Sequence, residues 1–99
     1  MQAKLILTPP VARIAIQGHF TFEGHRQFKE ATAAALAAPQ IETVEIDFAE
    51  VGYLDSAALG MLLLLNERAE GHRIVLRHAT GTVRSVLDIA NFGKIFEID

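Results

Sequence analysis

The chain has no cysteine and no tryptophan, and only one tyrosine and three prolines occur among its 99 residues. Without cysteine, disulfide bonds, thiolate zinc sites and thiol catalysis are excluded. Long hydrophobic runs are missing too: the longest apolar stretch, residues 57–65, is interrupted by a glycine. A membrane-spanning helix needs roughly 20 apolar residues. The first ten residues carry one cation and a short apolar run, which does not fit a signal peptide. We therefore expect a cytoplasmic protein without membrane insertion.

A strong excess of charge is also absent. Nine Lys and Arg residues against 12 Asp and Glu residues give a net charge of −3. This balance argues against general electrostatic binding to nucleic acid. Hydrophobic residues make up 51% and charged residues 21% of the chain, which is typical of a folded globular protein. We expect one domain over residues 1–99.

The hydrophobic pattern alternates between strand-like and helix-like periods. The expected elements are strands at residues 5–7 and 11–16, a helix at 22–38, a strand at 43–48, a helix at 56–70, a strand at 73–76, a helix from an N-cap at Thr82 to a stop at Gly93, and a strand at 95–98. This β-β-α-β-α-β-α-β order predicts the α/β class, with one small mixed sheet and helices packed on it. Leu59, Leu62 and Leu63 are expected to carry the second helix into the core.

Motifs for catalysis and for metal or nucleotide binding are missing. His72 and His78 flank one strand and would lie about 20 Å apart, too far to share a metal ion. Ser56 lacks the glycines of a hydrolase nucleophile elbow. No glycine-rich phosphate loop precedes a helix. We expect no enzymatic activity, no metal and no cofactor.

Charge is unevenly distributed along the second half of the chain. Residues 41–55 carry five acids and no Lys or Arg, whereas residues 68–84 carry four arginines and one acid. Two interpretations remain open: two ordinary solvated faces, or a polarised surface for a charged partner.

The junction at residues 53–60, Tyr-Leu-Asp-Ser-Ala-Ala-Leu-Gly, opens the second helix. In the plain interpretation, Asp55 or Ser56 is simply its N-cap. A serine in a first helical turn also lies among free backbone N–H groups and at the positive end of the helix dipole. The same donors that bind anions there can accommodate a phosphate. Ser56 is therefore a candidate phosphorylation site.

Residues 44–48, Val51 and residues 53–60 together resemble the signature of STAS domains, and more narrowly that of bacterial anti-sigma factor antagonists. In that family a strand ends in an aspartate and a hydrophobe, and Asp-Ser-Ser/Thr-Gly-Leu-Gly then opens a helix. Residues 90–96 are similar to the family's tail. The resemblance implies a STAS fold and a serine, here Ser56, that is phosphorylated by a kinase that is also the anti-sigma factor.

The chain departs from the family pattern in two places. Ala57 and Ala58 replace the usual Ser/Thr-Gly, and Thr21 stands where the family often has an acid. We expect the partner surface to comprise the loop of residues 51–55, the first turn of the helix after it and the loop of residues 19–24. On this surface we expect Asp55, Ala57, Ala58 and Thr21, with Tyr53 as a candidate contact. For Tyr53, a place in the core is an equally open alternative.

The resemblance implies two possible functions. The first is a switch that binds an anti-sigma factor kinase when Ser56 is unphosphorylated and releases it when a phosphate is present, with a serine phosphatase resetting the switch. The second is a non-switching structural subunit of a lipid-trafficking ABC transporter. The chain itself is expected to be a monomer or a weak dimer.

Overall fold

The computed structural model describes all residues from 1 to 99. The elements are β1 (Gln2–Thr8), β2 (Val11–Gln17), the 3₁₀ turn η1 (Phe22–Gly24), α1 (His25–Ala37), β3 (Thr43–Glu50), α2 (Ser56–Arg68), β4 (Arg73–Arg77), α3 (Gly81–Ile89), the 3₁₀ turn η2 (Phe92–Lys94) and β5 (Glu97–Ile98). The five strands form one sheet in the order β1-β2-β3-β4-β5. β1 is antiparallel to β2, and all other neighbours are parallel. The expected α/β class with a mixed sheet is confirmed.

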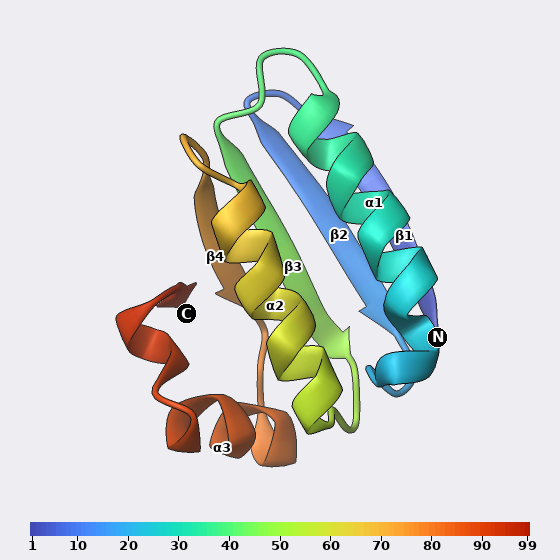
Figure 1. Ribbon diagram of the computed structural model, residues 1–99, viewed down its shortest axis with the longest axis vertical. Helices are drawn as coiled ribbons and strands as arrows, with labels where there is room; N and C mark the ends of the chain where they lie inside the picture. Colours follow the sequence, from blue (N-terminus) through green and yellow to red (C-terminus); the bar gives the residue numbers. More distant parts are fainter.

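Helices α1 and α2 lie side by side on one face of the sheet, and α3 lies near one end of it (Figure 1). Side chains alternate between the two faces of a strand, so β2 and β3 can each turn one apolar row toward the helices. In β3 this row is Val44, Ile46 and Phe48, and all three are buried as the sequence predicts. None of the helices combines the length and hydrophobicity needed to cross a membrane.

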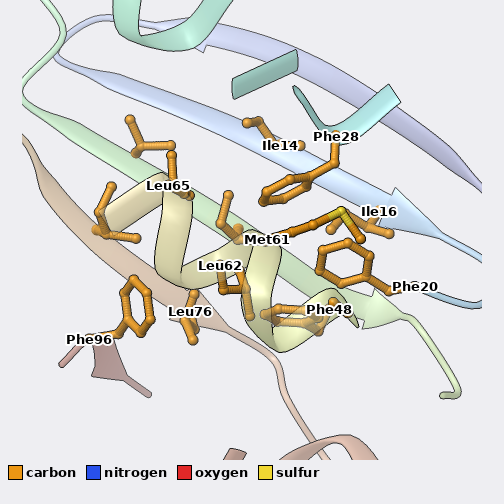
Figure 2. Packing of buried hydrophobic residues seen from close by; sticks show 14 of the residues in the cluster. Ile14, Ile16, Phe20, Phe28, Phe48, Met61, Leu62, Leu65, Leu76 and Phe96 are labelled. Atoms are coloured by element: carbon orange, nitrogen blue, oxygen red, sulfur yellow. The ribbon is translucent and has the colours of Figure 1, made fainter. Parts of the chain in front are cut away.

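Three aromatic rings pack together within the mainly aliphatic core between the helices and the sheet (Figure 2). The ring of Phe20 lies 4.9 Å from that of Phe28 on α1 and 6.3 Å from that of Phe48 on β3, measured between centroids. Phe20 belongs to no helix or strand; it comes from the loop after β2. The core therefore reaches into a loop at the end of the sheet where β2 and β3 finish.

The buried face of α2 differs from the expected one. Leu62 is fully buried, but Leu63 is 41% exposed and Leu59 only partly buried. The inward residues, Ala58, Met61, Leu62 and Leu65, follow the i, i+3, i+4, i+7 spacing of a helical stripe. Residues 61–65 are all apolar, so no polar residue marks which side faces the core. The prediction that Leu63 points inward is wrong.

Several element boundaries also differ from the prediction. Residues 22–24 form a 3₁₀ turn, so the first α-helix begins at His25. The last helix begins at Gly81, with Thr80 rather than Thr82 at the N-cap position, and it ends at Ile89. Gly93 lies in η2, while Asn91 takes the left-handed conformation, with φ 59°, after the helix. The terminal strand contains only Glu97 and Ile98.

Charged side chains pair across the face of the sheet that α1 and α2 leave uncovered. The carboxylate of Glu45 lies 3.6 Å from Arg13 and 2.8 Å from Arg77. Asp47 lies 2.9 Å from the ring of His78. These acids come from β3, and Arg77 and His78 lie in β4 or directly after it. Arg77 and His78 thus pair with acids of residues 41–55, whereas Arg73 and Arg84 pair with Glu97 and Asp88 instead.

Replacing Leu62 by alanine should destabilise the fold by about 2–5 kcal/mol, because burial is lost and a cavity remains. Leu63→Ala is the matched control and should change stability by about 0.5 kcal/mol or less. Urea denaturation of both variants measures the difference. Equal losses would contradict the orientation of α2.

Asp47 generates a prediction for the pH dependence of stability. Partial burial acts to raise the pKa of Asp47, but hydrogen bonds from the Ala49 N–H and with the His78 ring outweigh it and hold the pKa below 3.8. A lowered native pKa favours folding above the unfolded pKa, and this contribution disappears as the pH falls through the native pKa. Asp47→Asn should therefore be less stable than the wild type at pH 7, and the difference should shrink below about pH 4. Denaturation at several pH values measures this; a difference independent of pH would contradict it.

Candidate functional site

The site is built on two loops that run side by side, the loop after β2 and the loop after β3. Phe20 and Leu54 form an isolated parallel bridge between them. The Phe20 N–H donates to the Tyr53 carbonyl at 2.9 Å, and the Asp55 N–H donates to the Phe20 carbonyl at 3.3 Å. Both loops follow carboxyl ends of parallel strands, the edge where open α/β sheets bind their ligands. Their backbones hold each other in place.

Asp55 caps the N-terminus of α2. Its backbone is extended, and its Oδ1 accepts a hydrogen bond from the Ala58 N–H at 2.9 Å. The plain interpretation of Asp55 as the N-cap is thus confirmed. Ser56 is the first residue of the helix and is exposed, and its hydroxyl makes no hydrogen bond within the chain. The N–H groups of Ser56 and Ala57 have no carbonyl partner, so they remain free for an anion.

A shallow polar hollow lies beside this helix start. Its lining residues are Met1, His19, Thr21, Phe22, Glu23, Gly24 and Asp55. Thr21 lines this hollow. Glu23, two residues further on, contributes a second carboxylate besides Asp55, and it lies in the loop of residues 19–24 that the sequence predicts as part of the partner surface. The lining contains these two carboxylates and no Lys or Arg side chain.

Tyr53 and Ala58, two of the expected contact residues, differ in how far they are exposed to solvent. Tyr53 is 46% exposed, and its ring meets that of His19 edge to face at 5.6 Å between centroids. The alternative of a core tyrosine is therefore wrong. Ala58 is fully buried in the hydrophobic core, so its side chain cannot belong to a contact surface, and that expectation is wrong. Ala57 remains half-buried at the surface.

Side chains that bind metals are present but dispersed. No group of three or more His, Asp or Glu side chains lies close enough to hold an ion. The chemistry available at the site is therefore that of an exposed hydroxyl next to free N–H groups, a carboxylate cap and a half-exposed aromatic ring.

Removing the capping carboxylate should weaken α2 measurably. Asp55→Ala is expected to cost about 1 kcal/mol of stability, because the Ala58 N–H loses its partner. Asp55→Asn keeps an acceptor oxygen and should lose less. Equilibrium unfolding in urea compares the two variants. An Asp55→Ala protein as stable as the wild type would show that the cap does not hold the helix start.

Comparison with known proteins places this arrangement in a family. Residues 6–97 match a family model described as "Mlab, STAS domain". A STAS-domain containing protein of Pseudomonas aeruginosa is 41% identical over 87 residues, which cover 86% of this chain and 84% of that protein.

Solved structures share the fold at low sequence identity. The anti-sigma factor antagonist SpoIIAA of Bacillus, in its unphosphorylated form, gives a TM-score of 0.74 at 19% identity, covering 98% of this chain and 86% of that one. A putative anti-sigma factor antagonist from Thermotoga maritima gives 0.84 at 18% identity, covering 97% and 84%. A sulfate transporter family protein from Wolinella succinogenes gives 0.74 at 16% identity, covering 90% and 73%. The family model spans nearly the whole chain and the Pseudomonas relative is well matched, so the chain belongs to the STAS-domain family.

Proposed function

We propose that this STAS domain is an anti-sigma factor antagonist whose binding is switched by phosphorylation of Ser56. The observation that carries the proposal is the exposed hydroxyl of Ser56 in the first turn of α2, directly after the Asp55 cap. A kinase can reach this hydroxyl without unfolding any element. The likeness to SpoIIAA supports the proposal, because structures of that protein in both its unphosphorylated and phosphorylated forms share this fold, with TM-scores of 0.74 and 0.72.

In the unphosphorylated state, the partner packs against Tyr53, Thr21 and the Ser56–Ala57 turn. The partner is an anti-sigma factor that is also a serine kinase, and its sequestration frees the sigma factor. Because the Ser56 hydroxyl is uncharged, burying it against the partner costs far less than burying a phosphate at the same position. No catalytic role is assigned to the chain itself.

Phosphorylation of Ser56 adds about −1.5 to −2 charges at neutral pH. The free N–H groups of Ser56 and Ala57 can hold the phosphate locally, so the domain does not need to refold. Asp55 and Glu23 already make this edge acidic, and the new charge opposes burial against a closely packed partner. The partner is therefore released, and a serine phosphatase restores binding.

A second candidate function is a non-switching structural subunit of a lipid-trafficking ABC transporter. Thr21 favours it, because the acid often found at that position in the antagonists is missing. Leu63 and Leu64 favour it as well, since two neighbouring exposed leucines on α2 suit a permanent contact. In that case, binding would not respond to charge at Ser56.

Calorimetric titration against the anti-sigma factor kinase of the source cell tests the switch. Ser56→Ala should bind like the unphosphorylated wild type. Ser56→Asp should bind at least a hundredfold more weakly, because a charge is buried without a partner. Ser85 is an exposed serine on α3, so Ser85→Asp is the matched control and should bind normally. Equal affinities for all four proteins would exclude the switch and favour the structural subunit.

A further inference from the structure

One row of exposed residues runs along α2 away from the phosphorylation site. Ser56, Gly60, Leu64 and Arg68 are spaced four residues apart, and all four are exposed. Residues at this spacing form a single ridge on a helix surface, here about 18 Å long. We call these four residues the α2 ridge. Its first member is the proposed switch, and the other three have no part in the site described above.

Gly60 has no side chain and therefore leaves a gap in the middle of the α2 ridge. A Cβ atom added at Gly60 would meet nothing within 4 Å, so no internal packing requires glycine there. Its φ lies outside the left-handed region, so the backbone does not require glycine either. Glycine inside a helix nevertheless costs stability relative to alanine. Without a side chain, Gly60 leaves room on the helix surface for a close approach by the main chain of a bound partner.

The far half of the α2 ridge combines an apolar residue with free positive charge. Leu64 is 47% exposed and borders a groove between α1 and α2. Residues that line the groove are His25, Phe28, Lys29, Thr32, Met61, Leu64, Leu65 and Arg68, and none of them is acidic.

The two cations of this groove are unpaired. Lys29 and Arg68 make no salt bridge, which is also true of Lys4, Arg26 and Lys94, whereas the other four arginines pair with acids. In a chain whose net charge is −3, this groove therefore offers a positive site that is complementary to acidic side chains.

We propose that the partner docks an acidic amphipathic helix along the α2 ridge. The partner helix crosses closely at Gly60, packs apolar side chains on Leu64, and directs carboxylates toward Lys29 and Arg68. This inference rests on the proposed function and extends it, because the ridge begins at Ser56. One end of the docking helix thus meets the switchable charge, and the other meets fixed cations that select an acidic partner.

Titration of the same anti-sigma factor kinase against ridge variants tests the proposal. Gly60→Ala should raise the melting temperature by about 4 °C, because helix propensity improves, yet it should weaken binding severalfold. Gly60→Leu should weaken binding at least tenfold. A variant that becomes more stable while it binds less well cannot owe the loss to misfolding.

Charge reversal tests the cationic end. The double variant Lys29→Glu/Arg68→Glu should bind at least tenfold more weakly, with a larger loss at low salt. Lys29→Gln/Arg68→Gln serves if reversal impairs folding, and it should show a smaller loss in the same direction. The matched control is Lys4→Glu. Lys4 lies in β1 next to Ala15 of β2, on the face of the sheet away from α1 and α2. Its side chain is exposed and makes no salt bridge.

The outcomes separate this inference from the switch. If Ser56→Asp releases the partner while the Gly60 and charge variants bind normally, the ridge proposal is overturned and the switch stands. If the ridge variants weaken binding while Ser56→Asp binds normally, the ridge is supported and the switch fails. An equal loss in Lys4→Glu would show a general charge effect and overturn the assignment to the α2 ridge.

Discussion

The burial of Phe20 is the constraint on which the rest of the site depends. Its ring is fully enclosed and stacks against aromatic rings from α1 and β3. Its backbone N–H and carbonyl bind Tyr53 and Asp55 in the neighbouring loop. The side chain of Phe20 therefore belongs to the hydrophobic core, while its backbone holds the β3–α2 loop and the capping residue Asp55 in position. The Ser56 hydroxyl is held where it is because the loop before it is attached to the core through Phe20.

This attachment would allow the phosphorylation proposed for Ser56 to act without rearranging the molecule. Asp55 uses one of the orphan N–H groups at the start of α2, and two others stay open to solvent. A phosphate on Ser56 would enter a site whose donors are already oriented. The charge would then be added at the surface, above a core in which Ala58 and Leu62 are fully buried. The proposed recognition surface and the packing surface of α2 thus lie on opposite sides of the same helix.

Much of the fold follows from local patterns, and the differences have physical causes. Alternation identified β3 and its inward row, and the Asp55–Ser56 pair marked the start of α2. The sequence did not show which face of α2 is buried, because residues 61–65 are all apolar. The burial of Glu45 depends on arginines from two other strands, so it cannot be inferred from its own neighbours in the sequence.

At the site, the sequence motif located Ser56 and Asp55 but not everything around them. Glu23 lies in the 3₁₀ turn of residues 22–24 and lines the same hollow as Asp55, a juxtaposition of two loops that spacing in the sequence does not define. The groove beside Leu64 likewise arises from two helices far apart in the sequence. Spacing alone could not bring Lys29 and Arg68 together, since their proximity is a product of the tertiary fold.

The most direct test of the account is a comparison of backbone amide NMR spectra with and without phosphoserine incorporated at position 56. If the phosphate is held locally, chemical shifts should change in residues 19–24 and 53–60 only. Hydrogen-exchange protection of β3 and of the buried face of α2 should be unchanged. Shift changes spread through the sheet, or lost protection in α2, would show that the switch works by refolding and would contradict the central claim.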